Sequence, residues 1–114
     1  MKDDRLYLIH ISECIARIEE YVREGRETFL GSRLTQDAVI RNLQVMAESA
    51  QRLSDDLKTR HSEIDWRSIS GFRNVLVHDY LGVDIEYCWT IVADRLPELK
   101  RAVGAMLDEF GAQN

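Results

Sequence analysis

The chain of 114 residues is 45% hydrophobic and 31% charged, a composition typical of one soluble globular domain, which we expect to span residues 1–114. Its net charge of −5 argues against a nonspecific nucleic-acid binder, because phosphate-dominated affinity needs a basic surface. No apolar run approaches the ~18 residues that cross a bilayer, and the acidic N-terminus lacks a signal-peptide pattern. We therefore expect a cytoplasmic protein without a membrane partner.

The first amphipathic pattern lies at the N-terminus. Asp3 and Asp4 suit the positive end of a helix dipole, and Gly25 is a natural stop, so we expect a helix between them. A connection with two glycines, GRETFLGSRL, follows at residues 25–34. The apolar residues of the helix recur every three or four positions, as one buried face requires: Leu8, Ile11, Ile15, Ile18 and Val22.

The second pattern predicts another long helix in the middle of the chain. Thr35 is a plausible N-cap, with Asp37 in the first turn. The apolar positions again alternate in steps of four and three: Val39, Leu43, Met46, Ala50, Leu53 and Leu57.

The third helix is expected to open at Asp65, a good N-cap, and to end at Gly82. Gly71 lies inside it and weakens the helix, unless another backbone or a ligand approaches there. The buried face of this helix is marked by Ile69, Phe72 and Leu76.

The fourth pattern can be capped by Asp84 and keeps its phase to the end of the chain, although Pro97 lies inside it. A proline in a helix interior removes a hydrogen bond and bends the axis, so we expect one long kinked helix or two nearly collinear ones. No segment alternates as a strand does. The sequence therefore predicts an all-α, antiparallel bundle of four main helices.

The cysteines and histidines give no sign of a metal centre. Cys14 and Cys88 each lie in an apolar helical pattern, and without an export signal we interpret them as buried thiols rather than a disulfide. His10, His61 and His78 are scattered and share no metal-ligand spacing with the cysteines. We expect no metal and no cofactor.

Four versatile side chains fall within the segment SGFRNVLVHDYL, residues 70–81. Arg73 could form a surface salt bridge, or its guanidinium could clamp a phosphate. His78 could be a packed or surface imidazole, or could transfer a proton near neutral pH. Asn74 could bond within the helix end, or orient the histidine or a ribose hydroxyl. Tyr80 is most simply an aromatic at the boundary with water.

Helical geometry bears on whether this cluster can act as one site. Asn74 and His78 are four residues apart and share a face, whereas Arg73 and His78 lie roughly 140° apart around an ideal helix. Arg73 and His78 converge on one ligand only if the arginine reaches across, the helix loosens, or a second chain supplies half of the site. This geometry points towards a homodimer.

A cation beside a titratable imidazole suits the cleavage of RNA. RNA carries its own nucleophile, the 2′-hydroxyl, so an enzyme need only deprotonate it, protonate the leaving oxygen and stabilise charge at phosphorus. Histidine and arginine suffice without a metal ion. DNA lacks this hydroxyl and should resist.

The pattern Arg73-Asn74-x-x-x-His78-x-Tyr80 resembles the signature of HEPN-domain proteins, and the string WRSISGFRNVLVHDYLGVD resembles more narrowly the HepT-like toxin family. The segments DAVIRNLQVMAESAQRLSDDLK and ADRLPELKRAV are also similar to that family, so the resemblance covers most of the chain. In one departure, Ala47 precedes Glu48 where relatives often have glycine, which slightly favours the helix.

The resemblance implies a HEPN-type bundle, usually a homodimer with both motifs facing a shared cleft. It implies a metal-independent endoribonuclease toxin, inhibited by a cognate nucleotidyltransferase antitoxin. Arg73 and His78 would be catalytic, Asn74 supporting, and Tyr80 the residue to which the antitoxin adds AMP. Glu48 could pair with Arg73 or be an ordinary carboxylate of the bundle.

The same fold also suits a different function, because fold alone does not decide activity. The alternative is a non-catalytic helical module that docks a separate nucleotidyltransferase and helps it to hold substrate. Intact Arg73 and His78 favour cleavage, since docking alone would not need a titratable group beside a cation. A purely structural dimer is the third possibility.

Overall fold

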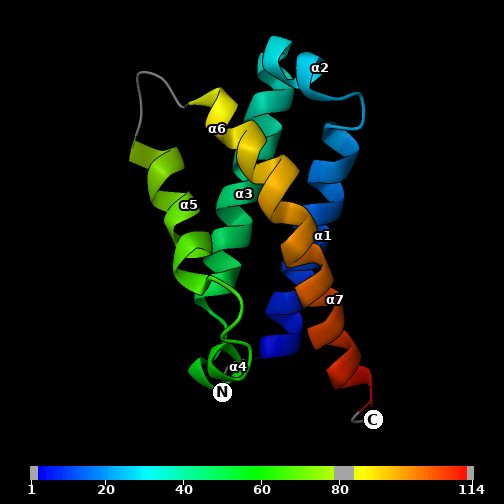
Figure 1. Ribbon diagram of the computed structural model, residues 1–114, viewed down its shortest axis with the longest axis vertical. Helices are drawn as coiled ribbons and strands as arrows, with labels where there is room; N and C mark the ends of the chain where they lie inside the picture. Colours follow the sequence, from blue (N-terminus) through cyan, green and yellow to red (C-terminus); the bar gives the residue numbers. More distant parts are fainter. Residues whose placement is uncertain (1–2, 79–83, 113–114) are drawn as a thin grey trace.

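The computed structural model describes residues 3–78 and 84–112, and these residues form helices without any strand. The four main elements are α1, α3, α5 and a C-terminal run of α6, η1 and α7 (Figure 1). The prediction of an all-α bundle of four main helices is confirmed. The bounds are α1 Asp4–Tyr21, α2 Arg26–Gly31, α3 Arg33–Gln51, α4 Asp55–Arg60, α5 Trp66–His78, α6 Ile85–Thr90, η1 Ile91–Arg95 and α7 Leu96–Ala112.

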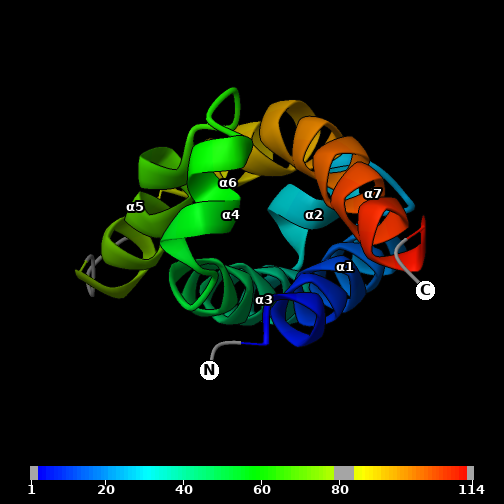
Figure 2. The same ribbon diagram turned by 90° about the horizontal axis from the view of Figure 1, so that it is seen from below.

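Successive main helices run in opposite directions, and α3 lies between α1 and α5 (Figure 1). The C-terminal run passes over the other side of α1, so that α5 stands at the periphery of the bundle (Figure 2). The two short helices lie at opposite ends, with α2 joining α1 to α3 and α4 joining α3 to α5. This up-down-up-down order follows from connections that are short in the sequence.

The apolar faces expected from the sequence meet in one core. Side chains of α1, α3 and α7 are fully buried there, Ile11, Leu43 and Met106 among them. Phe29 of α2 is also fully buried, and its ring lies 5.5 Å from that of Trp89 in α6. The short helix α2 thus closes one end of the bundle, in a segment where the sequence predicted only a connection.

Side-chain caps fix where the helices begin. The Asp3 carboxylate accepts a hydrogen bond from the Leu6 amide at 3.1 Å, and Asp84 accepts one from Tyr87 at 3.0 Å. The cap at Asp84 was expected, and α1 begins next to Asp3 and Asp4 as the sequence predicted. The expected cap at Thr35 is wrong: the hydroxyl of Ser32 is the acceptor, and the Thr35 amide donates to it at 3.2 Å.

The second expected helix is divided in two, because α3 ends at Gln51 and α4 begins after Ser54. The Ser54 amide and hydroxyl donate to the two carboxylate oxygens of Asp4, at 2.8 and 2.6 Å. The Ser54 hydroxyl also accepts from the Leu57 amide at 3.1 Å. The turn keeps Leu57 in the core, which explains why the apolar pattern continues across the break.

The C-terminal run accommodates Pro97 by a wider turn. Pro97 is the second residue of α7, directly after a π-helical turn. Just before it, η1 is π-helical, and the Leu96 amide donates to the carbonyl of Ile91, five residues back. The expected interruption therefore falls on the turn preceding the proline, and the helix continues on both sides (Figure 1). Among the described residues, no helix is long and apolar enough to cross a membrane.

Candidate functional site

The helix α5 carries the segment that the sequence marked as a site. Asp65 caps it, since its carboxylate accepts from the Ser68 amide at 3.0 Å, as expected. The indole nitrogen of Trp66 donates to the carbonyl of His61 at 3.1 Å, which holds the first turn to the preceding loop. Ile69 and Phe72 are buried against the core and orient the helix. The first half of α5 is therefore held by two hydrogen bonds and an apolar contact.

The structure places the backbone of Arg73, Asn74 and His78 in the second half of α5, and His78 is its last residue. The positions of their side chains, together with Tyr80 and the expected helix end at Gly82, lie outside the described residues. Their roles therefore stay predictions.

The register of α5 shows how the motif positions are distributed around the helix. Position 78 is nine residues after Ile69, which is about 180° around an ideal helix. Position 73 is four residues after Ile69, about 40° from it. Positions 73 and 78 therefore lie about 140° apart around α5, the separation expected from the sequence.

Glu48, which the sequence analysis gave as either a partner of Arg73 or an ordinary carboxylate, lies on α3, the helix against which α5 packs. Glu48 is exposed on the surface of α3. The pairing of Glu48 with Arg73 stays a prediction.

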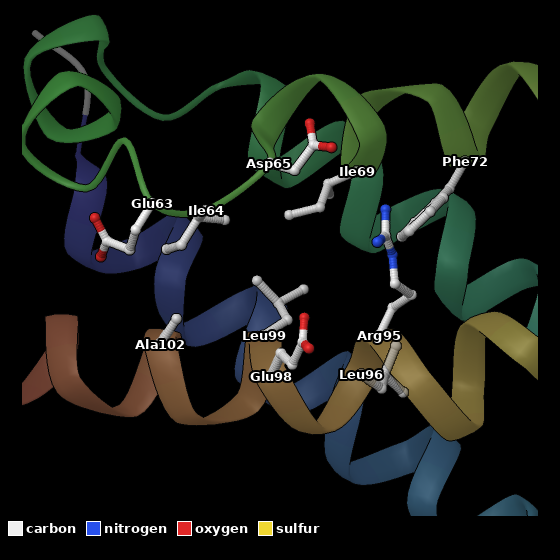
Figure 3. A pocket seen from close by; sticks show the side chains of 10 residues that line it. All are labelled: Glu63, Ile64, Asp65, Ile69, Phe72, Arg95, Leu96, Glu98, Leu99 and Ala102. Carbon is white, nitrogen blue, oxygen red and sulfur yellow. The ribbon is translucent and has the colours of Figure 1, made fainter.

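A pocket of about 260 Å³ opens between the first half of α5, the loop before it, and the C-terminal run (Figure 3). No sequence motif marks this pocket, because its residues are spread over three segments. Arg95 reaches across it, and its guanidinium donates a hydrogen bond to the hydroxyl of Ser68 on α5. The apolar part of the lining is Ile64, Ile69, Phe72, Leu96, Leu99 and Ala102, and the charged part is Glu63, Asp65, Arg95 and Glu98.

The loop before α5 is also tied to α7 by a histidine. The side chain of His61 is 14% exposed, and its two ring nitrogens lie 3.5 Å from a Glu63 oxygen and 3.4 Å from a Glu109 oxygen. Arg60 lies 3.7 Å from the same oxygen of Glu109. These contacts give His61 a structural role. Among the side chains that the structure describes, no group of three His, Cys, Asp or Glu could hold a metal ion.

The cysteines behave as structural thiols. Cys14 and Cys88 are free and buried, which confirms the prediction. Burial raises the pKa of Cys14, and burial together with the charge of Asp84 raises the pKa of Cys88 to about 11. Both thiols are therefore protonated near neutral pH and are poor nucleophiles.

An all-α antiparallel bundle with Arg73, Asn74 and His78 on its peripheral helix defines a HEPN-type protein. Comparison with known protein families assigns the chain to a narrower group. The model of the family described as HepT-like ribonuclease matches residues 11–106, and the chain belongs to this family. The match includes all of α5.

Three curated relatives show the range of similarity. A protein of Thermococcus cleftensis named "Probable ribonuclease HepT" is 42% identical over 95 residues, which is 82% of this chain and 86% of that protein. A candidate RNase of Caldanaerobacter subterraneus is 32% identical over 96% of this chain and 98% of its own length. A protein of Methanocaldococcus jannaschii, named as a gamma-glutamylcyclotransferase and candidate RNase, is 34% identical over 96% of this chain. The chain spans only half of that last protein. No solved structure matches the chain significantly.

Proposed function

We propose that this protein is a metal-independent endoribonuclease and the toxin of a toxin–antitoxin pair. The family match over residues 11–106 carries the proposal, because it includes the helix that bears Arg73 and His78. The relatives named "Probable ribonuclease HepT" and candidate RNase support RNA as the substrate.

The proposed chemistry needs only groups that the chain and the RNA supply. The imidazole of His78 removes the proton of a ribose 2′-hydroxyl, whose oxygen attacks the adjacent phosphorus. The bond from phosphorus to the 5′-oxygen breaks, and that oxygen takes up a proton. The products are a 2′,3′-cyclic phosphate and a free 5′-hydroxyl. The Arg73 guanidinium stabilises the charge that develops on the phosphoryl oxygens, and Asn74 orients the imidazole or the ribose.

The site is proposed to form in the cleft of a homodimer. Positions 73 and 78 diverge around α5, so two copies of this helix facing each other can bring an arginine and a histidine together. Two copies of Arg73 in one cleft also create a local positive potential in a chain whose net charge is −5. An acidic protein can in this way bind RNA locally.

Regulation is proposed to act at Tyr80, two residues after His78. A partner nucleotidyltransferase would transfer AMP to its hydroxyl. The added bulk and negative charge beside the cleft would exclude the phosphates of RNA.

The test is the cleavage of total cellular RNA by purified, unmodified protein in the presence of EDTA. The wild type should produce cyclic-phosphate ends, and H78A should lose activity by a factor of about 10² or more, as expected on removal of a general base. The matched control is H10A, because His10 is an exposed histidine on α1, far from α5 in the sequence. Equal cleavage by wild type and H78A would refute the role of His78. No cleavage by dimeric wild type would favour the docking module.

A second experiment tests the shared cleft. If each site combines Arg73 of one subunit with His78 of the other, mixing inactive R73A and H78A proteins forms heterodimers with one intact site. Activity should then reappear on mixing. If both residues act from the same subunit, each subunit of the heterodimer lacks one of them. Neither site is then intact, and mixing restores no activity.

A further inference from the structure

The pocket beside α5 is lined by four core residues that retain slight exposure, although Val92, at 8%, is more exposed and does not line it. Most core side chains are 2% exposed or less, whereas Ile69 and Leu99 are each 6% exposed, and both line this pocket. Phe72 and Leu96, at 3% each, line it too. The floor of the pocket therefore presents apolar surface that a ligand could cover, and covering it would be favourable.

The rim of the pocket selects the charge of such a ligand. It holds three carboxylates, Glu63, Asp65 and Glu98, and one guanidinium, Arg95, all on exposed residues (Figure 3). The guanidinium already donates to Ser68. An excess of negative charge repels phosphate, so the pocket is not part of a path for RNA.

The partners of the carboxylates single out one of them. Asp65 caps α5, and Glu63 lies 3.5 Å from His61. Glu98 lies beside the apolar floor, and among the described residues it has no ion-pair or hydrogen-bond partner. Glu98 is therefore the carboxylate available to a cation.

The volume of the pocket and the charge of its rim together limit which class of molecule can occupy it. A volume of about 260 Å³ is below the range of roughly 300–1,000 Å³ that drug-sized ligands occupy, so the pocket suits a smaller molecule than a nucleotide. A second copy of the chain, docked about a two-fold axis through the pocket, would bring two acidic rims together. Both arguments disfavour the proposed RNA substrate and the proposed dimer as occupants.

We propose that this pocket binds a small organic cation, with its apolar body on Ile69, Phe72 and Leu99 and its ammonium or guanidinium group at Glu98. The proposal concerns binding alone and does not depend on the ribonuclease function. The ligand would contact Phe72, which directly precedes Arg73 in the sequence of α5.

Titration of ¹⁵N-labelled protein with two matched probes tests the proposal. Phenethylamine and 3-phenylpropionate share a ring and a two-carbon chain but carry opposite charges. Phenethylamine should produce saturable shifts of backbone amides in residues 63–72 and 95–102, and 3-phenylpropionate should not. Absence of saturable shifts there, or equal binding of both probes, would overturn the proposal.

Two charge-reversal variants locate the cation. E98K should weaken phenethylamine binding about five-fold, the factor to which an exposed ion pair amounts. D108K changes the net charge equally on an exposed residue of α7 that does not line the pocket, and it should leave binding unchanged. Equal weakening by both variants would show a general charge effect and would contradict the role of Glu98.

Discussion

Replacing Gly71 by alanine should stabilise the protein, although this residue lies in the middle of the helix that carries the motif. Glycine in a helix interior is less favourable than alanine by about 0.8–1.0 kcal/mol. Gly71 has no left-handed φ, and a Cβ built on it meets no atom within 4 Å in the described part of the chain. The methyl group therefore adds no clash, and the gain should be about 0.5–1 kcal/mol.

The measurement is urea denaturation of wild type and G71A at low protein concentration, with an unchanged m-value expected. G104A is the matched control, because Gly104 is an exposed position inside α7 whose added Cβ would also meet nothing within 4 Å. Both variants should be stabilised by similar amounts. If G104A gains stability and G71A loses it, the reasoning that space at Gly71 is open is wrong, and another backbone approaches α5 there.

Further predictions concern the support of the bundle and its thiols. D4A should lower the free energy of unfolding by about 1–3 kcal/mol, because the amide and hydroxyl of Ser54 lose their charged acceptor. The control D108A should change the free energy of unfolding by less than about 0.5 kcal/mol. Urea denaturation measures both variants. Cys14 and Cys88 should react with Ellman's reagent at pH 8 only as fast as the protein unfolds, and fast labelling of native protein would contradict their burial. Burial raises the pKa of Cys88 to about 11, whereas the thiol of the unfolded chain ionises near about 8.5. The contribution of this shift to the stability of the native state is therefore fully present below about pH 8.5 and falls as the pH rises towards about 11. Thermal unfolding of C88A should depend less on pH in that range than that of wild type.

The fold could be predicted from hydrophobic periodicity because each long helix presents one continuous apolar face. The errors arose where the pattern keeps its phase across a break. Leu53 and Leu57 continue the stepping of α3, but Ser54 between them starts a new helix by bonding to Asp4, some fifty residues earlier. Such a contact leaves no local signal. The cap at Ser32 in place of Thr35 was missed for a similar reason, because both residues are good caps and the position of α2 decides between them.

The candidate site shows the same division. Arg73, Asn74 and His78 were found because they are close in the sequence and fall on one helix. The pocket was not found, since Glu63, Ile69 and Glu98 come from three segments and meet only after folding.

The central claim is that α5 carries a nuclease motif that uses the 2′-hydroxyl of RNA. The most direct test is to incubate wild type and H78A, each with EDTA, with an RNA oligonucleotide and with the same sequence containing 2′-deoxyribose throughout. Wild type should cleave only the RNA, leaving a 2′,3′-cyclic phosphate, and H78A should cleave neither. Cleavage of the deoxy substrate, or cleavage of RNA by H78A at the wild-type rate, would contradict the central claim.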